Sequence, residues 1–492
     1  MSLPSFILFD AYQPKDLLLA AKLAPFFLSY AKPRMNTDTP ASAVTMRRDD
    51  GPCQCYTSYP TPDRFDSGFT SAHLAQALAQ RRTGLTARAL PLSLGVNLFH
   101  DSAIGSCASK APGLSELAER YVRYLSREVE LLADAMGRVQ TFSHLYLNAR
   151  SQWRWTAQQV GALMAVLGRR FQMVPGGEYT IELCAHSVDP DSLGPLAQLG
   201  FNRLRLDMHP GGQDVQADSG LRMEQVLATI PAARQHGFES VQLDLRYPLV
   251  SQPSAWMQRE MHAVCAMQPE RIAIDQTAPP LCCAPGTRRH ETSASPGPAG
   301  FRSMQTWLRE QLTRAGYVHV GLHLFALPDD SLAVARRQGR LHRSCLGYGT
   351  QPDGDLIGLG VAAKGCVGLT YHQNAPSFQS YAHLIDQARL PTVRGMTLSR
   401  DDLLRRSVIM ALLCHGEVQF ESIELGFLVD FRRYFAREIQ DLAALQEEGW
   451  VHMDTVGIQV APLDWSAVRA VARVFDRYLQ TDRDRARSSR IH

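Results

Sequence analysis

The chain lacks three features that would each have pointed to a distinct class of protein. It has no run of 18 apolar residues, so we expect no membrane-spanning helix and no membrane partner. Lys and Arg number 51 against 48 Asp and Glu, and no basic run resembles a backbone-binding patch, which argues against nucleic acid as a partner. The ten cysteines show no paired framework spacing, which favours reduced thiols in the cytoplasm over disulfides.

What is present is an ordinary globular composition, with 45% hydrophobic and 20% charged residues over a length of 492. We expect roughly two to four domains and a monomer. Residues 1–54 are expected to form a leader or arm, partly disordered, with Met35 or Met46 as alternative starts. This stretch lacks the charged beginning and small-residue cleavage site of a signal peptide.

From residue 91 onwards, short β-prone runs alternate with helical patterns. The clearest helix is predicted over Ser115–Met136, where apolar residues recur at steps of three and four, and Gly137 suits its C-terminal cap. The strands are predicted at Leu92–Leu98, His144–Leu147, Tyr179–Leu183, Arg203–Leu206, Ser240–Leu245 and Arg271–Ile274. Connections of this length imply parallel strands. Periodicity alone does not separate a partial barrel from a flat doubly wound sheet, but both gather ligands at the carboxyl ends of the strands.

The later part of the chain changes character. Residues 284–304 are rich in Pro, Gly and Ser and are predicted to form a surface loop, before a helix over Gln305–Arg314 and a strand over Val318–Phe325. From Arg400 the pattern is mostly helical, with a turn or hairpin at Val451–Val460. This module resembles a winged helix, but its balanced charge favours a lid or packing role over DNA binding.

Several segments resemble one family in unbroken order. Cys55–Pro62 reads CYTSYPTP, Gly200–Leu204 reads GFNRL and Asp244–Tyr247 reads DLRY. The C-terminal matches are FALPDDSLAVA at Phe325–Ala335, LHR at Leu341–Arg343, GYGTQ at Gly347–Gln351, DLIGLGV at Asp355–Val361 and LSRDD at Leu398–Asp402. Together they resemble the oxygen-independent coproporphyrinogen III oxidase family, which is of the radical S-adenosylmethionine, HemN-like type.

The resemblance implies an α/β fold: a partial (βα)6 barrel of the radical SAM type with a C-terminal, mostly helical domain. We place the barrel at residues 55–304, an α/β extension that completes it at 305–399, and the helical domain with its tail at 400–492. The family oxidatively decarboxylates coproporphyrinogen III to protoporphyrinogen IX, using a [4Fe–4S] cluster and S-adenosyl-L-methionine.

Two motifs of this chemistry are missing. The family's CxxxCxxC cluster motif falls within Leu92–Lys110, which holds only Cys107, whereas such clusters are usually held by several thiolates. The glycines of the family's GGGTP turn are replaced within Asn148–Gln152, where Arg150 would crowd the cofactor. A cluster rebuilt from Cys53, Cys55 and Cys107 is a weak alternative, and we assign no metal ligand.

Other positions match the family's cofactor site. They are Tyr56, Glu182, Asp244, Ala278 and, if a one-residue gap is allowed, Arg222. The alternative for Glu182 and Asp244 is a structural role, in which they cap strand ends or pair with nearby arginines. These matches alone do not establish a cofactor, and haem or a porphyrin is an alternative ligand.

Charge suggests a substrate site. Four propionates on the substrate call for arginines, which grip carboxylates bidentately. We predict Arg205, Arg246 and Arg343 as substrate-binding residues, with ordinary surface charge as the alternative. Our principal hypothesis is therefore a coproporphyrinogen oxidase-like, tetrapyrrole-binding or accessory protein without radical catalysis. The alternatives are the oxidase activity itself, or a purely structural or regulatory protein that binds no tetrapyrrole.

Overall fold

The structure is a computed structural model and describes residues 56–83, 92–98, 114–137, 139–149, 155–185, 188–208, 219–248, 252–277, 298–351, 354–461 and 465–488. Of the sequence predictions, the arm at 1–54, Cys107, Arg150 and Ala278 lie outside them.

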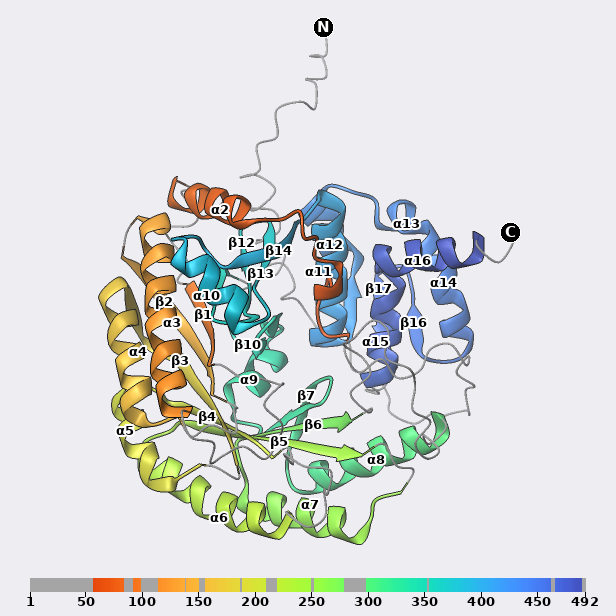
Figure 1. Cartoon of the computed structure of the whole chain (residues 1–492). Coiled ribbons are helices and arrows are strands. Elements are labelled where there is room, and N and C mark those ends of the chain that lie inside the picture. Colours follow the sequence, from red (N-terminus) through yellow and green to blue (C-terminus); the bar gives the residue numbers. More distant parts are fainter. Residues whose placement is uncertain are drawn as a thin grey trace, which may run out of the picture.

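A single curved sheet of twelve strands forms the centre of the fold (Figure 1). Its order is β14-β13-β12-β11-β1-β2-β3-β4-β5-β6-β8-β7. The first six strands along the chain, which pair in parallel, are β1 (Leu92–Asn97), β2 (Gln140–Asn148), β3 (Phe171–Cys184), β4 (Arg203–Asp207), β5 (Ser240–Pro248) and β6 (Arg271–Thr277). The flanking strands are β7 (Val318–Gly321), β8 (Leu324–Ala326), β11 (Leu356–Leu359), β12 (Lys364–Val367), β13 (Thr370–Asn374) and β14 (Thr392–Thr397).

Helices follow the parallel strands and cover the outer face of the sheet (Figure 1). They are α3 (Leu114–Met136), α4 (Ala157–Arg170), α5 (Leu193–Gln198), α6 (Ser219–Gln235) and α7 (Ala255–Met267), with α2 (Ser71–Thr83) before β1 and α8 (Pro298–Arg314) and α10 (Phe378–Asp386) after β6. Helix α9 (Ser331–Arg337) instead lies on the inner side of the sheet (Figure 1), where Leu332 lines the cavity. Six βα units in sequence order with open sheet edges make a partial barrel, which confirms the predicted fold class.

The local signals explain most of these elements. Helix α3 buries Tyr121, Leu125, Val129 and Leu132 on one side, as its apolar spacing predicts. Gly137 ends it in the left-handed region at φ 71°, and its N–H donates to the carbonyl oxygen of Ala133. All six predicted strands of the barrel are present. Five of them extend beyond their predicted bounds, and β1 ends one residue earlier than predicted, at Asn97.

Two predicted elements differ from the structure. The strand expected over Val318–Phe325 is a hairpin of β7 and β8, because Leu322 turns the chain at φ 43°. As a result, His319 lies on β7, whereas His323 lies between β7 and β8. Helix α8 begins at Pro298, inside the stretch predicted as loop, and proline is well tolerated in a first helical turn.

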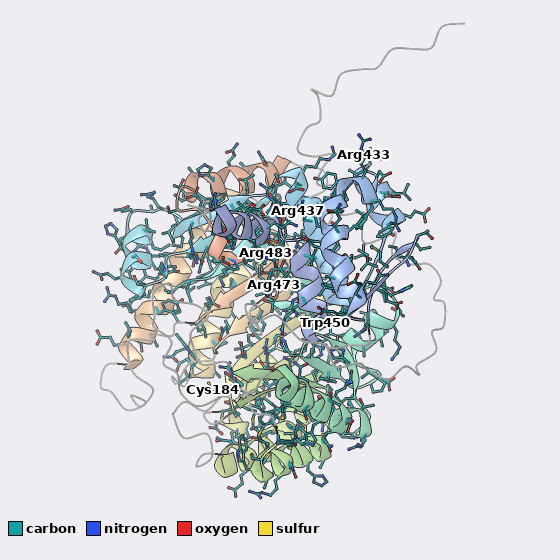
Figure 2. All side chains as sticks on the ribbon, turned by 90° about the vertical axis from the view of Figure 1, so that its right-hand side faces the viewer. Cys184, Arg433, Arg437, Trp450, Arg473 and Arg483 are labelled. Carbon is teal, nitrogen blue, oxygen red and sulfur yellow. The ribbon has the colours of Figure 1, made fainter. Side chains whose placement is uncertain are left out.

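The C-terminal part contains helices and a small antiparallel sheet. Its helices are α11 (Arg400–His415), α12 (Phe420–Phe427), α13 (Phe431–Tyr434), α14 (Ala436–Glu447), α15 (Trp465–Val474) and α16 (Arg477–Ser488). The sheet has the order β15-β17-β16, from Glu417–Gln419, Gly457–Val460 and Val451–Met453, so the predicted hairpin is present. Figure 2 shows Arg433, Arg437 and Arg483 on the helices of this part. Arg437 pairs with Asp484 at 2.8 Å, so acids accompany the basic residues.

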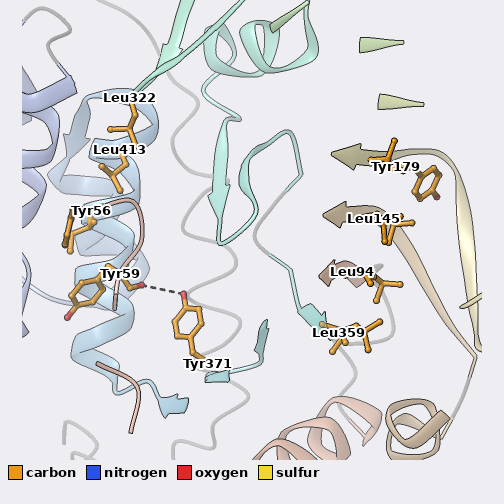
Figure 3. Packing of buried hydrophobic residues seen from close by; sticks show 14 of the residues in the cluster. Tyr56, Tyr59, Leu94, Leu145, Tyr179, Leu322, Leu359, Tyr371 and Leu413 are labelled. Carbon is orange, nitrogen blue, oxygen red and sulfur yellow. Dashed lines mark hydrogen bonds between the residues drawn. The ribbon is translucent and has the colours of Figure 1, made fainter. Parts of the chain in front are cut away.

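The described segment before α2 packs against the C-terminal part. In Figure 3, Tyr56 and Tyr59 lie beside helix α11, and Tyr371 donates from its hydroxyl to the carbonyl oxygen of Tyr59 at 3.5 Å. The same view shows Leu94, Leu145 and Tyr179 on the barrel strands. One hydrophobic core therefore joins the barrel to the C-terminal helices. In the described part of the chain, no helix is both long and apolar enough to cross a bilayer.

Candidate functional site

The concave side of the sheet encloses a cavity of about 580 Å³. Alternate residues of a strand point to the same face, so each parallel strand contributes every second side chain to this cavity. Strand β2 contributes His144, Tyr146 and Asn148, and β4 contributes Arg203 and Arg205. The cavity is within the size range of small-molecule sites.

A buried network of charges lies on the inner face of strands β2 to β5. Glu182 and Arg205 are direct neighbours in the β3–β4 register, and the Arg205 guanidinium forms a salt bridge with Asp244 on β5. Arg205 Nε also lies 3.8 Å from Glu182 Oε1. The Tyr146 hydroxyl donates to Glu182 and accepts from Arg205 Nη1 at 3.1 Å. The two carboxylates that match the family's cofactor site therefore share one arginine.

The network is deeply enclosed and carries an excess carboxylate. Glu182 is 2% exposed and Asp244 is 9% exposed. Burial raises the pKa of Asp244 to about 6, although Arg205 opposes this shift. Gln242 donates from Nε2 to Asp244 Oδ1 at 2.7 Å and stabilises the ionised form. Two carboxylates share one guanidinium, so the positive charge of this network is already neutralised by carboxylates of the protein itself.

Two further arginines of the inner face are ion-paired. Arg203 lies 3.4 Å from Glu178, and Arg271 lies 2.9 Å from Asp330, whose side chain is only 4% exposed. Thr350 also donates to Glu178 at 3.3 Å, which connects this layer to the loop that follows the β9–β10 hairpin. The positive charges of these two arginines are therefore paired with carboxylates of the protein itself.

The other wall of the cavity is a hairpin of β9 (His342–Ser344) and β10 (Gly347–Gly349). Arg343 donates from Nε to the carbonyl oxygen of Thr57 at 2.7 Å, and its guanidinium lies 4.5 Å from the centroid of the Tyr348 ring. Lys364 begins β12 and lines the same cavity. Burial raises the pKa of the Cys345 thiol, while the positive charges of Arg406, Lys364 and Arg343 oppose that rise.

The structure places the predicted site residues in different surroundings. It brings Glu182, Asp244 and Arg205 together, and Arg343 lines the same cavity. Arg246 follows Asp244 by two residues on the same face of β5 but does not line the cavity. Tyr56 is buried beside the C-terminal helices, while its neighbour Thr57 reaches the cavity. Arg222 lies in α6 and Ala278 is outside the described residues.

Sequence reasoning missed Tyr146, Gln242 and Arg271 as parts of this site. Tyr146 lies two residues from His144, which lines the cavity, and Gln242 lies two residues from Asp244, which belongs to the charge network. The alternation of side chains along each strand could therefore have indicated both residues. Their partners could not be inferred in the same way, because pairing between strands depends on register.

The residues present do not fit the cofactors that the resemblance implies. Among the described residues, no three His, Cys, Asp or Glu side chains converge as metal ligands, and the loop after β1 carries only Cys107 in sequence. The two carboxylates that match the family's cofactor site are engaged by Arg205. We therefore derive no reaction step through either group.

Comparisons with known proteins support one family. The family model for the HemN C-terminal domain matches residues 398–465. The oxygen-independent coproporphyrinogen III oxidase of Pseudomonas aeruginosa is 33% identical over 460 residues, covering 91% of this chain and 98% of that protein. The Escherichia coli protein of the same name is 30% identical over 439 residues, covering 89% and 95%.

The structural comparison agrees. The solved structure of coproporphyrinogen III oxidase from Escherichia coli, described as a radical SAM enzyme, matches with a TM-score of 0.74 at 30% identity, over 86% of this chain and 97% of that one. Similarity at this level extends through the barrel and the C-terminal helices. The chain therefore belongs to the oxygen-independent coproporphyrinogen III oxidase family.

Proposed function

We propose that this protein binds an anionic tetrapyrrole in the barrel cavity without radical SAM catalysis, as a binding or accessory member of its family. The supporting observation is the charge lining the cavity, where the cations Arg203, Arg205, Arg271, Arg343 and Lys364 outnumber the carboxylates Glu178 and Glu182. A cavity with this bias favours a ligand that carries several carboxylates. We also propose a monomer in the cytoplasm.

Arg343 and Lys364 carry the proposal. The other three cations are ion-paired with Glu178, Asp244 and Asp330. Arg343 instead binds a backbone carbonyl and an aromatic ring, and no carboxylate among the described residues pairs with Lys364. A guanidinium accepts a propionate bidentately, and an ammonium on a flexible stem adjusts to a second one.

The test is a titration with coproporphyrin III, followed by quenching of porphyrin fluorescence. We expect the wild-type chain to bind and the double variant Arg343→Ala with Lys364→Ala to bind about 10- to 100-fold more weakly, from the loss of two charge-assisted contacts. Arg340→Ala is the matched control, because Arg340 is exposed and its guanidinium, among the described residues, pairs with Gln338 close by in sequence.

A second ligand separates charge from shape. The tetramethyl ester of coproporphyrin III has the same ring but no carboxylates, and it should bind equally weakly to the wild type and to the double variant. Equal binding of the free acid to all three proteins would overturn the assignment of Arg343 and Lys364.

Radical chemistry is tested separately. The purified chain is treated anaerobically with iron and sulfide, its visible spectrum is recorded, and S-adenosylmethionine cleavage is assayed with a reductant. We expect a colourless protein and no 5′-deoxyadenosine. A brown protein that forms 5′-deoxyadenosine would overturn this part of the proposal and support the oxidase activity instead. Cys53, Cys55 and Cys107 would then be the candidate cluster ligands.

A further inference from the structure

The buried network around Arg205 has the composition of a cation site that is already filled. Two carboxylates, Glu182 and Asp244, and the hydroxyl of Tyr146 surround one guanidinium. The ring of Tyr146 also lies 5.9 Å from the guanidinium carbon, within reach of a cation–π interaction. Carboxylates beside an aromatic face are what a buried ammonium or sulfonium group requires.

The register explains why Arg205 reaches both acids. On the inner face, Glu182 on β3 is paired with Arg205 on β4, and Arg205 is paired with Gln242 on β5. Asp244 lies two residues beyond Gln242 on the same face. The guanidinium therefore sits between the two carboxylates without leaving its own strand.

We propose that Arg205 is a built-in counter-ion that closes a binding site for a small organic cation in this barrel. Two buried carboxylates are costly without a cation. In this chain a side chain supplies the positive charge permanently, so a diffusible cation gains little by entering. This inference rests on the part of the proposed function that excludes radical chemistry, and it is independent of porphyrin binding through Arg343 and Lys364.

The inference makes removal of the charge a gain-of-binding experiment. Arg205→Gln keeps a polar but shorter side chain and leaves Glu182 and Asp244 without their cation. We measure S-adenosylmethionine binding by equilibrium dialysis and expect the variant to bind at least roughly tenfold more tightly than the wild type, the value of one modest charge interaction in a partly buried site. Neutral 5′-methylthioadenosine should show a smaller gain.

Two matched variants control for general loosening of the barrel. Arg205→Lys keeps the positive charge and should stay closed to S-adenosylmethionine. Arg203→Gln removes an arginine of the same strand that pairs with Glu178 instead, and it should produce no gain. A gain in Arg203→Gln equal to that in Arg205→Gln would overturn the proposal.

The affinity of the wild-type chain for S-adenosylmethionine is the reference for every variant. If the wild type binds S-adenosylmethionine as tightly as Arg205→Gln, the site is not closed and the proposal is wrong. A folded Arg205→Gln, shown by an unchanged circular dichroism spectrum, that gains no affinity is equally decisive against it. Coproporphyrin titration of the same variants reports separately on the proposed function.

Discussion

Glu128→Ala is expected to lower the free energy of unfolding by about 3–5 kcal/mol, because it removes a buried carboxylate that satisfies three donors. Glu128 lies on α3 and is 2% exposed. It accepts from the backbone N–H of Gly360 at 2.8 Å, the amide of Asn374 at 2.6 Å and the hydroxyl of Tyr381 at 2.6 Å. These partners follow β11, end β13 and belong to α10, so one side chain joins the barrel to its extension.

Urea unfolding of the wild type and the variant measures this loss. Glu130→Ala on the same helix is the control: Glu130 forms a pair with Arg170, its side chain is 43% exposed, and its loss should cost less than about 1 kcal/mol. If Glu128→Ala costs no more than Glu130→Ala, the three donors find other partners and the interpretation of Glu128 as a structural link is wrong.

The same carboxyl predicts a pH dependence. Burial raises the pKa of Glu128 to about 7, so the folded state holds this proton more tightly than the unfolded chain, where a glutamate titrates near its ordinary value of 4.5. Its contribution to stability is complete below about pH 4.5 and is lost as the pH rises through 7.

Comparison with Glu128→Gln isolates that contribution, because glutamine does not titrate. The difference in unfolding free energy between wild type and Glu128→Gln should therefore shift between pH 5 and pH 7.5, with the wild type losing ground at the higher pH. A difference that is the same at both pH values would show that Glu128 titrates normally.

Asp355→Ala is expected to cost a similar amount, about 3–5 kcal/mol, because it removes the carboxylate from a buried ion pair. The side chains of Arg81 on α2 and Asp355 before β11 are 6% and 7% exposed. Asp355 also accepts from the backbone N–H of Gly368 at 2.8 Å. The substitution leaves a buried guanidinium without its carboxylate partner. It also removes the ion pair that joins α2 to the segment before β11.

A double variant tests this explanation. Asp355→Ala leaves the buried charge of Arg81 without its carboxylate, and Arg81→Met removes that charge. The double variant should therefore lose less free energy of unfolding than the sum of the two single variants. Asp386→Ala is the surface control, since Asp386 pairs with Arg127 at 52% exposure and should contribute less than about 1 kcal/mol. Simple additivity in urea unfolding would contradict a buried, coupled pair.

Elements with a clear local signal could be predicted from the sequence. Helix α3 follows from its apolar spacing and from Gly137, and the parallel strands follow from short β-prone runs separated by helices. The β7–β8 hairpin could not be predicted, because Leu322 adopts a left-handed conformation that a β-prone run does not signal. Contacts with the rest of the sheet override local propensity at that point.

The candidate site divides in the same way. Sequence indicated Glu182, Asp244, Arg205 and Arg343 as site residues, and all four lie on or beside the cavity. It assigned Arg205 to the substrate, whereas the structure shows its guanidinium bound to Asp244 and Tyr146. Pattern along one strand identifies which face a residue occupies but not which side chain of the next strand it meets.

The sequence by itself therefore determined the family, the order of the βα units and the single cysteine in the loop after β1, because these follow from residue identity and from periods of 2 and 3.6 residues. Only the tertiary structure decided which arginines are used up by internal carboxylates and which face the cavity without one. That choice depends on strand register, which brings Arg205 against Glu182 and leaves Arg343 and Lys364 on the opposite wall.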